Sequence, residues 1–193
     1  MQVLQQANHL FLNRQFSDAV ALYDQILNVD PKNLDAINNK GYALGKMKKH
    51  QEAIALYDFG LSLYPNERTL RINKISSLRK LKMYQDALDN CDAILGESSN
   101  DNIVLYHKER ILYSIGRYSE SSKCCDEILL SYPENSEVLF DKAIALAMTK
   151  DEDCIPTLGR AVHVDPNLKI KAKHHGAFSD HLHDQDFLRL VSD

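Results

Sequence analysis

The sequence contains no tryptophan, and it is poor in glycine and proline. Its 193 residues include seven glycines and five prolines. It has no glycine-rich phosphate loop, no nucleophile elbow and no serine–histidine–carboxylate arrangement. We therefore expect a protein that is not an enzyme and that uses no cofactor.

Cysteine is also scarce, and the four cysteines form no CxxC pair. Cys91, Cys124, Cys125 and Cys154 all fall at apolar or semi-buried places in helical patterns. Free cysteine commonly behaves as a small core hydrophobe, so we expect buried thiols, no disulfides and a reducing compartment.

Long apolar runs are missing, and neither sign of charge dominates. No stretch predicts a membrane helix or a signal peptide, which favours a cytoplasmic protein without a membrane partner. The formal net charge is −4, from 23 basic and 27 acidic residues. This balance offers no general attraction to phosphate backbones, so we expect no nucleic-acid partner.

The chain repeats itself every 34 residues. Leucines share one row, small residues share a second and prolines share a third. The rows are Leu10, Leu44, Leu78, Leu112 and Leu146; Ala19, Ala53, Ala87 and Ser121; and Pro31, Pro65 and Pro133. A period of this length indicates a stack of similar supersecondary units rather than one globular core.

Each period predicts two helices joined by a short polar break. Between Leu34 and Pro65, apolar residues recur at helical spacing over 35–46 and again over 51–63. Proline then ends the second helix, because it cannot continue the hydrogen-bond ladder. The same plan predicts a single domain over 1–193, with repeats at about 1–33, 34–67, 68–101, 102–135 and 136–167 and a cap over 168–193. The first helix is expected to start near Met1 without a capping residue.

The best-formed unit resembles a tetratricopeptide repeat. It runs through Asn39-Lys40-Gly41-Tyr42-Ala43-Leu44, then Glu52-Ala53-Ile54-Ala55-Leu56-Tyr57, then Gly60 and Tyr64-Pro65. The resemblance implies an all-α, right-handed α-solenoid of antiparallel helix pairs. Ile75 and Glu109 depart from it, because each stands where a small residue is usual. The tail resembles the segment that closes such arrays, through Ala177-Phe178, Leu182, Asp184, Phe187 and Leu190.

The resemblance also implies a function and a place for it. In that family the first helix of each repeat lines a concave groove, so we expect a protein–protein interaction scaffold that binds a peptide or helix of a partner protein. The expected groove residues are Asn8, Asn38, Tyr42, Ile72, Arg79, Tyr106, Arg110, Tyr113, Phe140 and Ile144. Some of them could instead pack against a neighbouring helix. The C-terminal tail of a chaperone is a poorer candidate for the ligand. Members of the family that bind such tails hold the terminal carboxylate with asparagines and basic residues. Here Asn8 and Asn39 match that set, but Leu4, Thr69 and Asn73 stand where basic residues would be.

Three further patterns can be interpreted either as binding sites or as ordinary solvated surface. A lysine row and an acidic row are read as complementary solvated faces: Lys40, Lys74, Lys108 and Lys142; and Asp24, Asp58, Asp92 and Asp126. The histidines between His174 and His183 are read as a polar cap surface rather than a metal site. Basic residues between Arg68 and Lys82 form a local patch that could meet an acidic peptide or nucleic acid, and the overall acidity of the chain makes nucleic acid the poorer interpretation.

Two other functions stay open at this point. The chain could be a self-assembling structural subunit that stacks through its ends as a homo-oligomer, or the regulatory arm of an enzyme complex.

Overall fold

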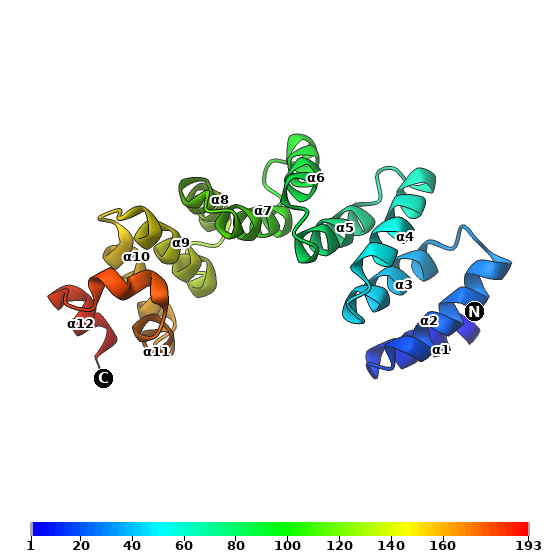
Figure 1. Cartoon of the computed structure of the whole chain (residues 1–193), viewed down its shortest axis with the longest axis horizontal. Helices are drawn as coiled ribbons and strands as arrows, with labels where there is room; N and C mark the ends of the chain where they lie inside the picture. Colours follow the sequence, from blue (N-terminus) through cyan, green and yellow to red (C-terminus); the bar gives the residue numbers. More distant parts are fainter. Residues whose placement is uncertain (1, 193) are drawn as a thin grey trace. The chain divides into compact units, whose positions relative to one another are not determined.

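The computed structural model describes residues 2–192 of the chain, and all regular structure within that range is helical (Figure 1). The helices are α1 (Gln2–Leu12), α2 (Phe16–Val29), α3 (Leu34–Lys46), α4 (His50–Leu63), α5 (Arg68–Lys80), α6 (Tyr84–Glu97), α7 (Asn102–Ser114), α8 (Tyr118–Ser131), α9 (Ser136–Thr149), α10 (Cys154–Val164), α11 (Leu168–Lys173), the 3-10 helix η1 (Gly176–His181) and α12 (Gln185–Val191). The all-α class is therefore confirmed. Met1, on which the expected uncapped start depends, lies outside the described residues.

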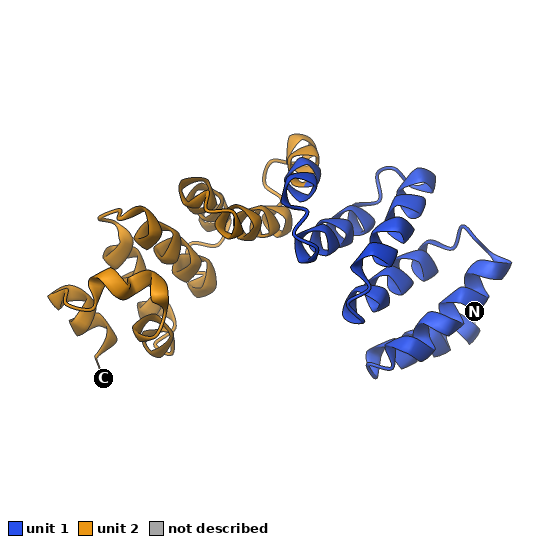
Figure 2. Ribbon diagram, viewed as in Figure 1, with its two compact units in different colours: residues 1–90 blue, residues 91–193 orange. Residues whose placement is uncertain are grey.

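The chain divides into two compact units, residues 1–90 and 91–193, with the division inside α6 (Figure 2). In the first unit α1 pairs with α2 and α3 pairs with α4. In the second unit α7 pairs with α8 and α9 pairs with α10. Helices thus pack as consecutive pairs, as the sequence predicts, while one continuous domain over 1–193 stays a prediction.

The turn inside each of the first four pairs is built in the same way. A residue with positive φ stands two positions after the last residue of each first helix: Arg14, Lys48, Lys82 and Gly116. The next amide donates to the carbonyl of the leucine row, as Lys49 does to Leu44 at 2.9 Å. This is the Schellman arrangement, which satisfies carbonyls that the helix end leaves free.

Four first helices begin on a side chain that caps them. These N-cap residues also follow the 34-residue period: Asn33, Glu67, Asp101 and Asn135. Asn33 accepts a 3.0 Å hydrogen bond from the amide of Ala36, and Asn135 accepts one of 3.1 Å from Val138. Such caps satisfy backbone donors that have no intrahelical partner.

Small residues let the two helices of a pair approach closely. Ala7 and Ala19 of the first pair are fully buried together. At Gly60, an added Cβ would lie 2.6 Å from Leu70 Cδ1 and 2.8 Å from Ile37 Cγ2. The glycine therefore allows α4 to contact both α3 and α5.

The two charged rows pair with each other. Each lysine of a first helix reaches the aspartate of the preceding second helix: Lys40–Asp24 at 2.5 Å, Lys74–Asp58 at 2.6 Å, Lys108–Asp92 at 2.7 Å and Lys142–Asp126 at 2.7 Å. The complementary faces predicted from sequence are therefore direct ion pairs between successive repeats, two in each unit.

The C-terminal segment covers the last helix pair. Phe178 of η1 and Phe187 of α12 are fully buried against α9 and α10. Leu182, expected to share this role, is instead 45% exposed, because it follows η1 at a turn.

Candidate partner-binding surface

In the first unit, α1, α3 and α5 are joined by a chain of side-chain hydrogen bonds. Asn73 donates to Asn38 at 2.8 Å, Asn38 to Asn39 at 3.1 Å, and Asn39 to Asn8 at 3.0 Å. The hydroxyl of Tyr23 also donates to Asn8, at 2.7 Å. The amides therefore fix the first helices side by side, and Asn8 and Asn39 are engaged with each other.

Tyr42 is the large aromatic side chain that this face exposes most, at 40%. Its ring meets that of Phe11 edge-on, with 5.5 Å between centroids. The Lys46 ammonium lies 4.9 Å from the Tyr42 centroid. The exposed ring thus contacts both Phe11 and Lys46. Ile72 and Arg79 of α5 are half-buried.

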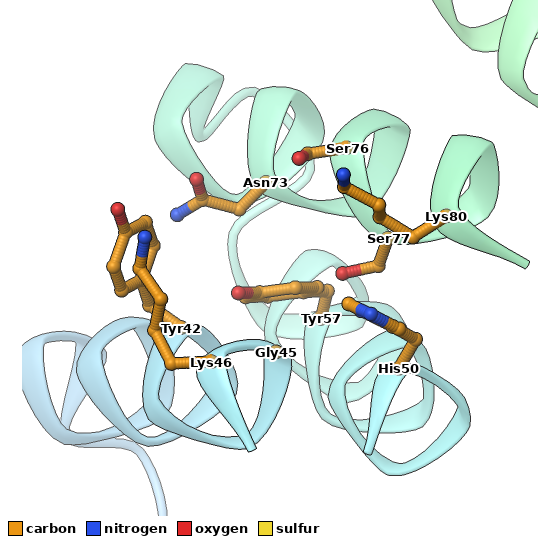
Figure 3. Close-up of a pocket in the computed structure, with 9 residues that line it drawn as sticks. All are labelled: Tyr42, Gly45, Lys46, His50, Tyr57, Asn73, Ser76, Ser77 and Lys80. Carbon is orange, nitrogen blue, oxygen red and sulfur yellow. The ribbon is translucent and has the colours of Figure 1, made fainter. Parts of the chain in front are cut away.

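A pocket of about 160 Å³ opens between α3, α4 and α5. Figure 3 shows its lining, with Tyr57 across the floor: Tyr42, Gly45, Lys46, His50, Tyr57, Asn73, Ser76, Ser77 and Lys80. Gly41 makes room for that floor, since a Cβ there would lie 2.7 Å from Tyr57 Cζ.

The lining of this pocket is basic and hydroxylic, and none of these nine residues is acidic. Burial lowers the pKa of His50, and the nearby charge of Lys80 lowers it further. The imidazole is therefore harder to protonate than that of a free histidine, and the lysines of the lining are Lys46 and Lys80.

In the second unit, Tyr106 and Arg110 form one cluster on α7. The Arg110 guanidinium donates to the Tyr106 hydroxyl and lies 4.6 Å from its ring centroid. It also lies 3.6 Å from the carboxylate of Asp141 on α9. Burial raises the pKa of Asp141, and the charge of Arg110 opposes that rise.

Tyr113 lies further along α7 and is half-buried against Tyr118, with 5.3 Å between ring centroids. Burial raises the pKa of the Tyr113 hydroxyl.

Two expected groove residues, Phe140 and Ile144, do not line an open surface. Phe140 is fully buried and Ile144 is 6% exposed. The rings of Phe178 and His175 lie 6.0 and 6.1 Å from that of Phe140, and the Lys171 ammonium lies 4.4 Å from its centroid. The C-terminal segment occupies this part of α9, a contact between distant residues that helical spacing could not predict.

The tail histidines and the cysteines are the side chains of this chain best suited to metal binding or nucleophilic chemistry. Within residues 2–192, no group of three or more His, Cys, Asp or Glu side chains is placed to hold a metal ion. His181 lies 3.7 Å from Asp184, and His175 accepts a 3.2 Å hydrogen bond from the amide of Ala177. Burial raises the pKa of Cys91 and Cys124 to about 12 and that of Cys154 to about 11, so these thiols stay protonated.

The pocket residues Lys46, His50 and Ser77 were absent from the groove predicted from sequence. A signal for part of the pocket was available, because Lys46 and Lys80 stand 34 residues apart and occupy the same repeat position. His50 could not be found in this way, because its row is otherwise aromatic: Phe16, Tyr84 and Tyr118. Within the described range, no helix is both long and apolar enough to cross a membrane.

Comparison with known proteins gives one sequence match and several structural ones. A family model described as Tetratricopeptide repeat matches residues 22–55. No curated protein matches the sequence significantly.

Three solved structures illustrate the likeness. YrrB, described as a TPR protein with an unusual peptide-binding site, is 18% identical with a TM-score of 0.70, covering 86% of this chain and 87% of its own. MamA from Desulfovibrio magneticus is 14% identical with a TM-score of 0.79, covering 86% and 94%. A tetratricopeptide repeat protein from Parabacteroides merdae is 18% identical with a TM-score of 0.79, covering 89% and 68%. At these identities the likeness establishes the fold, an α-solenoid of paired helices.

Proposed function

Since the chain carries tetratricopeptide repeats, we propose that it is a non-enzymatic scaffold that binds a peptide or helix of a partner protein. The binding face is formed by the first helices of the repeats, within each of the two units. Folds of this kind commonly serve as protein-interaction modules, and YrrB is a structurally similar protein whose description names a peptide-binding site.

The exposure of Tyr42 carries the proposal. This ring is accessible, yet Phe11 and Lys46 restrain it. A side chain that is already ordered loses little entropy when it binds, and aromatic residues dominate the energy of protein interfaces. The pair Tyr106 and Arg110 offers a second anchor of the same chemistry in the other unit.

The asparagines support this face rather than grip a chain terminus. Asn8 and Asn39 hydrogen-bond to each other, and Asn8 also accepts from Tyr23. A clamp for a terminal carboxylate would also require basic residues at Leu4, Thr69 and Asn73, which the chain does not have. We therefore propose an internal peptide segment or a helix as the ligand.

Site-specific photo-crosslinking tests the proposal. The full chain carries p-benzoylphenylalanine in place of Tyr42 or Tyr106 and is irradiated in a lysate of its source. Adducts with the same partner protein are expected from these positions. Two exposed aromatic residues away from the first helices, Phe59 on α4 and Tyr132 after α8, serve as matched controls.

Adducts that form equally from Phe59 and Tyr132, or that fail to form from Tyr42 and Tyr106, would contradict the proposal. The alternative of self-assembly has its own signature. Adducts whose partner is a second copy of the chain, with a molar mass by light scattering that rises with concentration, would favour stacking into a homo-oligomer.

A further inference from the structure

We propose that the pocket between α3, α4 and α5 binds a phosphate-monoester group carried by the partner peptide. This inference rests on the proposed function and adds a chemical requirement for the ligand. The argument concerns the first unit alone, since all nine lining residues belong to it.

The first support is that, in the range the structure describes, Lys46 and Lys80 have no carboxylate beside them to balance their charge. Neighbouring lysines on the same helices are neutralised, because Lys40 pairs with Asp24 and Lys74 pairs with Asp58. Within residues 2–192, neither Lys46 nor Lys80 has a carboxylate oxygen within 4 Å. Two uncompensated ammonium groups at the rim of one pocket attract an anion.

The second support is the set of hydroxyl groups. Ser76 and Ser77 are adjacent on α5, and both line the pocket. Neither hydroxyl has a hydrogen-bond partner among the described residues. In contrast, Ser114 on α7 donates to the carbonyl of Arg110 at 2.7 Å. The pocket hydroxyls are therefore available as donors to a ligand.

The third support is a buried nitrogen without a partner. Nδ1 of His50 is shielded from solvent and makes no hydrogen bond in the described part of the protein. Gly45 leaves space beside it, because an added Cβ would lie 3.9 Å from this nitrogen and 4.0 Å from Ser77 Oγ. Buried polar groups normally have partners, so this nitrogen, which lies near Gly45 and Ser77, is a candidate partner for a group bound in the pocket.

The charge of the pocket favours phosphate over a carboxylate, while its volume admits either group. A volume of about 160 Å³ corresponds to roughly five water molecules at about 30 Å³ each. The two ammonium groups carry two positive charges, and a single carboxylate would neutralise only one of them. A phosphate monoester brings three acceptor oxygens and close to two negative charges, and lysine binds it as a point charge.

Nuclear magnetic resonance on the full ¹⁵N-labelled chain tests the pocket directly. The probes are N-acetyl-phosphoserine amide and N-acetyl-aspartate amide, titrated at matched ionic strength. We expect saturable shifts of the Gly45, Ser76 and Ser77 amides with phosphoserine, and binding about tenfold weaker with aspartate, since one charge and one acceptor are lost.

Variants separate the pocket from general charge effects. K46Q and K80Q should each weaken phosphoserine binding about tenfold. K32Q removes the same charge from an exposed position outside the pocket and should leave binding unchanged. G45A keeps every charge and introduces no close contact, so the fold is retained, yet its methyl group fills the space between His50 and Ser77. It should weaken phosphoserine binding as well.

Equal binding of aspartate and phosphoserine, an absence of saturable shifts, or an equal loss in K32Q would overturn the inference. Crosslinking from position 42 distinguishes a failure of the phosphate requirement from a failure of the proposed scaffold function. Adducts that survive phosphatase treatment of the lysate undiminished would overturn the phosphate requirement while supporting the scaffold. Saturable phosphoserine binding without any crosslinked protein would overturn the scaffold, and with it the peptide as carrier.

Discussion

The hydroxyl of Ser121 donates a 2.9 Å hydrogen bond to the carboxylate of Glu109, which is only 3% exposed. Glu109 stands in the row where other repeats have Ala7, Gly41 and Ala143. Ser121 stands in the row of alanines on the second helices. Both residues depart from the repeat pattern, and the hydroxyl of Ser121 supplies a hydrogen bond to the carboxylate that Glu109 buries in the same helix pair.

A double-mutant cycle tests the contribution of this hydrogen bond. Ser121→Ala alone should cost about 1–3 kcal/mol, because it removes a hydrogen bond from a buried carboxylate. In the Glu109→Ala background the same change should be close to neutral, because the carboxylate is gone. Urea unfolding of the four proteins gives the coupling energy. Equal costs in the two backgrounds would show that the hydrogen bond does not contribute.

The glycine at position 41 should not tolerate even a methyl group. Gly41→Ala places a Cβ against the rigid ring of Tyr57, and overpacking of this kind costs about 1–3 kcal/mol. Gly96→Ala is the control, because a Cβ there has no atom within 4 Å. It should gain up to about 1 kcal/mol from helix propensity. Thermal denaturation would contradict the packing argument if both variants shifted in the same direction.

The turn residues offer a pair of opposite substitutions. Gly116 and Lys82 occupy the same turn position, with φ of 79° and 61°. Gly116→Ala should lower stability by about 1 kcal/mol, and Lys82→Gly should raise it by up to about 1 kcal/mol, because side chains disfavour this conformation. Chemical denaturation measures both. A destabilised Lys82→Gly would mean that the lysine side chain contributes more than its backbone strain costs.

The C-terminal cap depends on its buried rings. Phe178→Ala should cost about 3–5 kcal/mol, as large-to-small changes of buried aromatics do. Leu182→Ala should stay within about 0.5 kcal/mol, because that side chain is half-exposed. Amide hydrogen exchange in α9 and α10 should become faster in Phe178→Ala, because the variant no longer covers these helices. Unchanged exchange there would show that the ring does not protect the last pair.

Two histidines should make stability fall in mild acid. Burial lowers the pKa of His50 and of His175, with Lys80 and Lys171 adding repulsion in each case and Asp141 partly opposing it at His175. The unfolded chain, with ordinary pKa values, then binds more protons below about pH 7 than the folded chain does. Stability should therefore be lost as pH falls from neutral through the lowered pKa values.

The melting temperature, measured between about pH 7.5 and about pH 5.5, tests this linkage. His50→Gln and His175→Gln should each flatten the decline, and glutamine can still accept the amide hydrogen bond of Ala177 that His175 accepts. A slope identical to that of the unaltered chain would assign the decline to other groups.

Local features were predictable because they depend on neighbours in sequence. The leucine row, the closing prolines and the polar breaks place the helix pairs, and the same rows supply the carbonyls that accept the turn hydrogen bonds. The N-caps at Asn33, Glu67, Asp101 and Asn135 show the same period. Capping and turn formation involve residues within five positions of one another, so a 34-residue pattern records them directly.

The lysine and aspartate rows lie between features that the sequence predicts and features that only tertiary packing decides. Sequence placed both on complementary faces, and the structure joins Lys40 with Asp24 across successive repeats. The pairing follows from regular stacking, since a repeat carries each contact forward along its period.

By itself, then, the sequence determined the helical repeats and the small residues at which paired helices meet. Only the tertiary structure decided which expected groove residues stay accessible and what they enclose. Phe140 is covered by Phe178 from 38 positions further along the chain, and the pocket joins Lys46, His50 and Lys80 from three different helices. The physical reason is that helical periodicity records which side of one helix faces inward, while enclosure depends on how separate helices pack against each other.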